Sequence, residues 1–223
     1  MEDLRASAPP KGIVSVNVGA VRSAEWQGKR FTTAIFKEPV RQRVPVRGVN
    51  VAGDDQADRA VHGGVDRALY AYASEDYAWW SSELGAPIEF ARFGENITTR
   101  GIAVNDALIG ERWRVGSTIL EVSQPRVPCY KLAMRMNDTS FVRRFSRALR
   151  TGTYLRIIVA GEIAADDPID VVFRPDHDVS IAELMKIYVF DHAQARRLLA
   201  VPALSDGWRT WAQEKAARAS QRH

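Results

Sequence analysis

Alternating apolar and polar positions dominate the first two-thirds of the chain. Within residues 13–18, the valines at positions 14, 16 and 18 alternate with Ser15 and Asn17. This is the period of two that a half-buried β-strand requires. The same reasoning predicts strands at residues 13–18, 31–36, 68–72, 111–115, 118–122, 154–159 and 169–173. Many short strands joined by turns indicate a mainly β fold of the barrel or sandwich kind. No β-α-β alternation typical of a parallel-sheet dinucleotide fold is visible.

Turn and cap residues divide this region further. Gly116-Ser117 lies between two predicted strands and predicts a hairpin. Two helices are expected among the strands, at residues 75–84 and 141–149, with Ser74 and Ser140 as their N-caps. Gly85 is placed to end the first of them.

The periodicity becomes helical after residue 180. Ser180 and Glu183 form a capping box, and the later cap candidates are Asp191 and either Ser205 or Asp206. Short helices of this kind are marginal alone, so we expect three helices that pack together or on the β-rich part. The change of pattern near residues 174–178 predicts a β domain at 12–173 and a small three-helix domain at 178–220.

Composition excludes several classes of protein. The 223 residues are 46% hydrophobic, and no apolar run approaches the ~20 residues of a membrane span. Early acidic residues and the lack of an apolar leader argue against a secretory signal, so we expect a cytoplasmic protein. The net charge of +4 is too small a surplus to predict nucleic-acid binding.

The strongest candidate for chemistry is the segment QPRVPCYK at residues 124–131, which holds the chain's one cysteine. Its two prolines predict that Cys129 stands in a rigid loop after a strand. Arg126 and Lys131 supply positive charge, which favours the thiolate that acts as nucleophile or soft-metal ligand. The alternative is a buried, unreactive cysteine.

A second candidate is the segment VHGGVDRA at residues 61–68. Gly63 and Gly64 allow backbone N–H groups to approach a ligand closely, and Arg67 could bind a phosphate through two parallel hydrogen bonds. His62 could donate a hydrogen bond or a proton. The segment's pattern, taken alone, favours the alternative of a tight turn before the strand at 68–72, with Asp66 and Arg67 as a surface ion pair.

Two weaker candidates are polar residues near strand ends. Asn96, within residues 93–99, could read the edge of a heterocycle, and Lys37 could contact a phosphate. A turn and a solvated lysine are the alternatives. The chain has no P-loop, dinucleotide fingerprint, nucleophile elbow or zincin motif, which argues against the corresponding enzyme classes.

Together these segments resemble a MOSC domain of the YiiM-like type, over roughly residues 12–173. The motifs are, in order, FKxP at 36–39, VxGDxQxD at 51–58, VHGGxDRAxYxY at 61–72, GEN at 94–96, GxxWxxG at 110–116 and QPRxPCxKL at 124–132. The C-terminal helices resemble the three-helix appendage of that subfamily. The resemblance implies a β-barrel that binds molybdenum cofactor, and reduction of N-hydroxylated compounds such as hydroxylaminopurines.

The resemblance also implies roles for particular residues. Cys129 maps onto the family cysteine that is regarded as molybdenum ligand or sulfur carrier. We expect catalytic roles for Cys129 and, as our own hypothesis for proton delivery, His62. Cofactor contacts are expected from Lys37, His62, Gly63, Gly64, Asp66, Arg67, Asn96, Arg126 and Lys131.

Such a reductase would need a separate electron-donor protein, since no flavin, haem or iron–sulfur motif is present. We expect a small-molecule N-hydroxylated substrate, no nucleic acid or membrane partner, and a monomer or homodimer.

Three alternatives stay open on the sequence. The first is a non-catalytic carrier of sulfur or cofactor that uses a persulfide on Cys129. The second is a hydrolase or transferase that pairs Cys129 with His62. The third is a nucleic-acid module built from the C-terminal helices, which their acidic residues disfavour.

Overall fold

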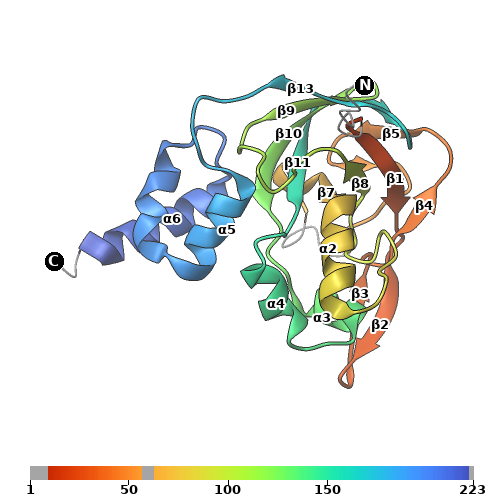
Figure 1. Ribbon diagram of the computed structural model, residues 1–223, viewed down its shortest axis with the longest axis horizontal. Helices are drawn as coiled ribbons and strands as arrows, with labels where there is room; N and C mark the ends of the chain where they lie inside the picture. Colours follow the sequence, from red (N-terminus) through yellow and green to blue (C-terminus); the bar gives the residue numbers. More distant parts are fainter. Residues whose placement is uncertain (1–9, 57–62, 221–223) are drawn as a thin grey trace, which may run out of the picture.

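The computed structural model describes residues 10–56 and 63–220, and its centre is one eight-stranded sheet (Figure 1). Its strands, in spatial order, are β13 (Ile169–Phe173), β9 (Arg112–Val115), β10 (Thr118–Pro125), β11 (Thr153–Val159), β7 (Leu69–Ala73), β8 (Ile97–Arg100), β1 (Gly12–Val18) and β4 (Glu38–Val40). The expected mainly β core is confirmed. The expected barrel is not closed: among the described residues no strand ladder joins β1 to β13, and the two ends meet only through a bridge between Gly12 and Pro168 and a few backbone hydrogen bonds beside it, such as that from the Ile13 N–H to the Asp167 carbonyl.

Within residues 10–56 and 63–220, the strand pairings are antiparallel with one exception. β7 and β8 run parallel, and the helix α2 (Ser74–Leu84) connects them. The expectation that the chain lacks β-α-β units is therefore wrong at this place. The sequence of β8, ITTR, gave no apolar alternation because all its residues but Arg100 are buried, including both threonines.

Smaller sheets stand beside the main one. β12 (Gly161–Ile163), β5 (Val44–Arg47) and β6 (Asn50–Val51) form one, and β2 (Arg22–Trp26) with β3 (Lys29–Thr33) form a hairpin. The predicted strand at 31–36 thus ends at Thr33. The predicted β9–β10 hairpin about Gly116 is confirmed.

The helices within the β region differ from expectation at their N-termini. Ser74 is the first helical residue of α2, and the cap position belongs to Ala73, without a side-chain cap. Gly85 ends α2 in the left-handed conformation, as predicted. In α4 (Phe141–Arg147) the Ser140 hydroxyl bonds to Asp138 instead of capping the helix.

An additional helix, α3 (Tyr130–Met136), follows the cysteine directly. Cys129 therefore stands in a loop after a strand, as predicted, at the last residue of the segment 126–129 that joins β10 to α3.

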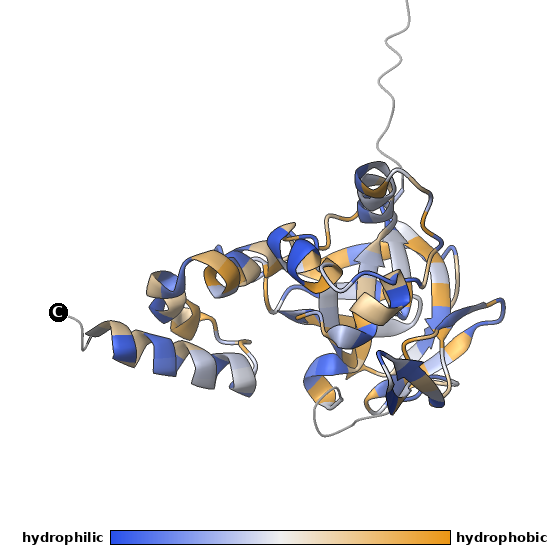
Figure 2. Cartoon of the chain, turned by 90° about the horizontal axis from the view of Figure 1, so that it is seen from below, coloured by the Kyte–Doolittle hydropathy of each residue, from blue (hydrophilic) through white to orange (hydrophobic). Residues whose placement is uncertain are grey.

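The C-terminal segment is helical, as the sequence predicts. It comprises α5 (Ile181–Phe190), the 3₁₀ helix η2 (His192–Ala200) and α6 (Asp206–Ser220), which form a separate layer beside the sheet (Figure 2). The capping box is present, because the Ser180 hydroxyl accepts a hydrogen bond from the Glu183 N–H at 3.1 Å. The middle segment is 3₁₀ and lacks a side-chain cap from Asp191.

Two clusters of buried side chains hold these parts together. The larger one fills the sheet and continues into the C-terminal helices through residues such as Leu184, Leu198 and Trp208. The second is aromatic and lies around α2, α3 and α4, with Trp80 and Phe145 at its centre. Because the first cluster is continuous, the helices pack as part of the same core as the sheet.

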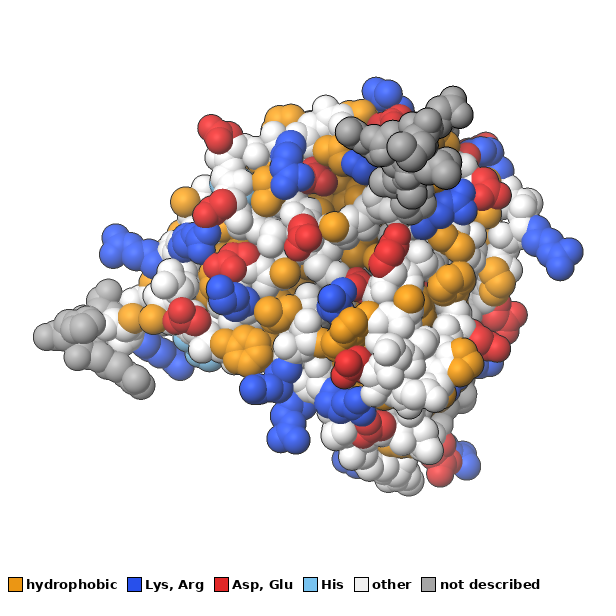
Figure 3. All heavy atoms as spheres, viewed as in Figure 1, with side chains coloured by type: hydrophobic (Ala, Val, Ile, Leu, Met, Phe, Trp, Pro, Cys, Tyr) orange, Lys and Arg blue, Asp and Glu red, His pale blue; other side chains and the backbone are white. Residues whose placement is uncertain are grey.

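The surface is mixed in charge. On the face seen in Figure 3, Lys and Arg side chains are interspersed with Asp and Glu. Among the described residues, no helix is long and apolar enough to cross a bilayer.

Candidate functional site

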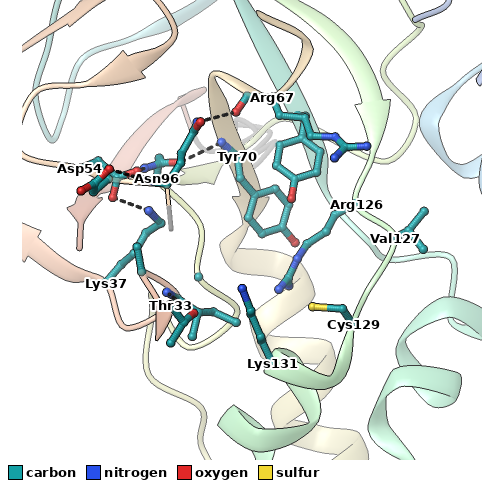
Figure 4. Close-up of a pocket in the computed structure, with 16 residues that line it drawn as sticks. Thr33, Lys37, Asp54, Arg67, Tyr70, Asn96, Arg126, Val127, Cys129 and Lys131 are labelled. Atoms are coloured by element: carbon teal, nitrogen blue, oxygen red, sulfur yellow. Dashed lines mark hydrogen bonds and ion pairs between the residues drawn. The ribbon is translucent and has the colours of Figure 1, made fainter. Parts of the chain in front are cut away.

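A cavity of about 120 Å³ opens where the end of β10 meets the start of α3. Predicted site residues that line it are Lys37, Arg67, Asn96, Arg126, Cys129 and Lys131. They come from segments far apart in the chain, and Figure 4 shows the ends of Arg126, Lys131 and Cys129 converging. His62 lies outside the described residues.

Cys129 lies between the cavity and a neighbouring groove and lines both. It is half-buried, with extended backbone at the N-cap position of α3. Its side chain lines the cavity and also a larger neighbouring groove of about 800 Å³, to which Gly63, Gly64, Asp66 and Arg67 contribute. Cys129 and the diglycine turn therefore line the same groove.

Arg126 places a buried positive charge at the cavity. Its residue is only 6% exposed, and its guanidinium lies 5.0 Å from the centre of the Tyr70 ring. Its Nη1 has no hydrogen-bond partner among the described residues. An arginine stays charged in proteins, and an unsatisfied buried donor is costly, so this atom is suited to an anion that enters the cavity.

Lys37 belongs to a buried network. Its ammonium pairs with Asp54, whose carboxylate also accepts hydrogen bonds from the Gly19 N–H and the Asn96 amide at 2.8 Å each. Burial lowers the pKa of Lys37, although Asp54 opposes the shift. The pair therefore adds little net charge to the cavity.

Asn96 is occupied by the backbone around it. Its side-chain oxygen accepts the Tyr70 N–H at 3.0 Å, and its amide nitrogen donates to Asp54 and to the Asn17 carbonyl. Asn96 lines the cavity, but these bonds use its polar atoms to join β1, β7 and the loop before β8.

Asp66 is held from the sheet side. Arg156 donates to its carboxylate at 2.5 Å, and the Ser123 hydroxyl donates to its backbone carbonyl at 2.6 Å. These bonds fix the 3₁₀ turn η1 (Val65–Arg67), which carries Arg67 to the wall shared by cavity and groove.

Known protein families match most of this chain. The MOSC domain family matches residues 58–170, and the YiiM-like, 3-alpha helix domain matches residues 179–215. This chain belongs to the MOSC domain family and is of the YiiM-like type.

Relatives agree with that assignment. Protein YiiM of Escherichia coli is 34% identical over 201 residues, which cover 87% of this chain and 88% of that protein. The crystal structure of YiiM from Geobacillus stearothermophilus matches this MOSC protein with a TM-score of 0.77 and 31% identity, over 92% of this chain and 99% of that one. A protein named Reductase from Gibberella moniliformis is 28% identical over 83% of this chain and 33% of its own length.

Some residues of this MOSC site were not predicted from the sequence. Tyr70 and Tyr154 line the cavity, and Asp54 neutralises Lys37. Tyr70 and Asp54 stand inside motifs that carried the family resemblance, so a signal was present. Tyr154 lies in β11 and gave no local signal, because only the β7–β11 pairing brings it beside Tyr70.

Proposed function

We propose that this protein binds a molybdenum cofactor at Cys129 and reduces N-hydroxylated compounds. The observation that carries the proposal is that one cavity is lined both by the half-buried Cys129 and by Arg126, whose Nη1 has no hydrogen-bond partner in the described part of the chain. Family membership and the reductase-named relative support the same direction.

The residues fit the chemistry of such a cofactor. Its phosphate is an anion, and Arg126 offers a buried donor with no other partner among the described residues. Lys131 and Arg67 line the same cavity and add positive charge. A thiolate sulfur suits a metal that already carries sulfur ligands. The cavity could hold part of such a ligand, and the adjoining groove offers further room.

The chain's own residues then have distinct tasks. Cys129 would ligate the metal, Arg126 would hold the anionic group, and the Lys37–Asp54–Asn96 network would keep β1, β7 and the cavity wall in place. When bound, the cofactor supplies the exchange of two electrons with the substrate. Cleavage of an N–O bond takes two electrons and two protons and yields the amine and water, so an external electron donor is required.

Turnover tests the proposal. Cofactor-loaded protein is mixed with a chemical electron donor and a hydroxylaminopurine, and formation of the aminopurine is followed. We expect turnover by the wild type and none by Cys129→Ser. Loaded wild type without any turnover would contradict the reductase and leave the sulfur or cofactor carrier as the explanation for the thiol.

A further inference from the structure

The groove beside Cys129 differs in chemistry from the cavity. The charged residues that line the cavity are Lys37, Arg67, Arg126 and Lys131 with Asp54 and Asp55, so the cations outnumber the carboxylates even though Asp54 pairs with Lys37. The only charged residues among the described lining of the groove are Asp66 and Arg67, of opposite sign. Asp66 is moreover paired with Arg156. The cavity therefore favours an anion and the groove a neutral molecule.

The C-terminal helices give this groove an aromatic wall. Tyr188 of α5 and Trp208 and Trp211 of α6 line it. Their rings pack edge to face, with centroids 5.1 Å apart for Tyr188–Trp208 and 5.6 Å apart for Trp208–Trp211. Trp208 is buried and Trp211 is half-buried. The Trp211 ring also meets the His192 ring, with centroids 5.5 Å apart, and the Lys215 ammonium, 5.8 Å from its centre, so only part of this ring remains exposed for stacking.

Direct bonds hold the aromatic wall against the sheet. The Ser205 hydroxyl donates to the side-chain oxygen of Gln124 at 2.7 Å, and Arg156 donates to the Ala203 carbonyl at 2.9 Å. Gln124 is in β10 and Arg156 in β11, which lie next to each other in the sheet. The groove is thus preformed, which lowers the entropic cost of binding.

We propose that this groove binds a neutral, flat heteroaromatic ring that stacks on Trp211, and that it forms the substrate-side half of the site. The assignment rests on the proposed function for its catalytic meaning, because Cys129, Arg67, Val127 and Tyr154 form the wall shared by groove and cavity. Base–aromatic stacking tolerates many ring types, and backbone N–H groups near Gly63 and Gly64 offer donors to ring nitrogens. The three-helix domain is then part of the site.

Adenine binding to cofactor-free full-length protein tests the assignment by calorimetry. We expect adenine to bind, and 2-piperidone, a non-aromatic cyclic amide, to bind far more weakly. Trp211→Ala should weaken adenine binding about tenfold, the size typical of a lost stacking partner. Trp79→Ala is the matched control, since Trp79 is also half-buried but packs on Arg150 and Trp80, away from the groove.

A second variant guards against misfolding of Trp211→Ala. Gly207 lines the groove, and a Cβ built there meets no atom within 4 Å, so Gly207→Phe should fold and obstruct the groove. It should also weaken adenine binding about tenfold. Absence of adenine binding by the wild type, or equal binding by the wild type and both groove variants, would overturn the assignment.

The same preparations separate this inference from the proposed function. Molybdenum retention is measured on cofactor-loaded wild type and on Trp211→Ala. If the protein retains molybdenum but Trp211→Ala leaves the affinity for adenine unchanged, only the assignment of the groove is refuted. Adenine binding that depends on Trp211, in a protein whose molybdenum content does not depend on Cys129, would refute the cofactor proposal alone.

Discussion

At the scale of single residues, the side chains of the site differ in whether their polar atoms have hydrogen-bond partners. The polar atoms of Lys37, Asp54 and Asn96 form hydrogen bonds and an ion pair with one another and with the backbone. Arg126, equally buried, keeps Nη1 without a partner among the described residues. An unpartnered buried donor lowers the stability of the empty protein, and this stability is recovered when an anion binds to the donor.

Arg126→Met tests this distinction. Removing a buried charge while keeping volume should leave the unfolding free energy of the cofactor-free protein equal or higher, while cofactor retention falls. Chemical denaturation and molybdenum analysis measure the two effects.

Arg135→Met is the matched control, because Arg135 stacks 4.8 Å from the Phe36 ring centre and donates to the Arg92 carbonyl outside the cavity. That variant should lose stability and keep its cofactor. Equal cofactor retention in Arg126→Met and wild type would remove Arg126 from the site.

At the scale of elements, sequence patterns located structure that repeats locally and missed structure that depends on distant contacts. Seven strands and the capping box of α5 were predictable from alternation and spacing. β8 was not, because its threonines are buried by contacts with β1 and β7. α3 was hidden by the prolines that precede it, although its start fixes Cys129.

The residues of the site also fall into those that local sequence motifs predicted and those that only tertiary contacts reveal. Motif residues identified Cys129, Arg126 and Lys131 as neighbours, because they are close in sequence. The use of Asn96 as a structural bridge, and the aromatic wall from α6, follow from tertiary contacts that single-sequence patterns do not carry.

Gly116→Ala tests the turn that joins β9 to β10. Gly116 has φ +55°, and an added Cβ would lie 2.3 Å from the Glu162 carbonyl oxygen. The unfolding free energy should fall by about 2–5 kcal/mol, since the backbone conformation is strained and the neighbour is rigid. Gly28→Ala, at φ +74° with nothing within 4 Å, should cost only about 1–2 kcal/mol. Denaturant titration compares the two, and equal losses would contradict the steric argument.

Asp167→Asn tests the ion pair between Asp167 and Arg43 and its pH dependence. Burial acts to raise the pKa of Asp167, but hydrogen bonds from Arg43 and the Ala164 N–H lower it overall. A lowered pKa means that the carboxylate stabilises the fold above about pH 3.8 and loses that effect as the pH falls through its folded value.

The variant should therefore lose about 1–3 kcal/mol at neutral pH, and its difference from wild type should shrink in strong acid. Stability measured across pH checks this, with the exposed Asp170→Asn as control. A difference that grows on acidification would contradict the assignment.

At the scale of the whole molecule, one arginine joins the three parts that make the groove. Arg156 donates to Asp66 of η1, to Glu121 of β10 at 2.8 Å, and to the Ala203 carbonyl before α6. The hydrophobic core is also continuous between sheet and helices. The C-terminal helices are therefore expected to unfold together with the sheet.

Arg156→Met should lower the unfolding free energy by about 2–5 kcal/mol, because Asp66 loses the ion pair with Arg156 and Glu121 keeps Arg112 but loses Arg156. Hydrogen exchange should also speed up in η1 and around Ala203. Arg30→Met removes an exposed pair with Glu25 and should change stability by less than about 0.5 kcal/mol. Unchanged exchange at Ala203 in Arg156→Met would show that the helices are held by other contacts.

The most direct test of the central claim is the molybdenum and pterin content of protein purified from cells with intact cofactor synthesis. We predict that the wild type carries both, and that Cys129→Ser folds normally but loses the metal. Molybdenum in Cys129→Ser at the wild-type level, or none in either protein, would contradict the account.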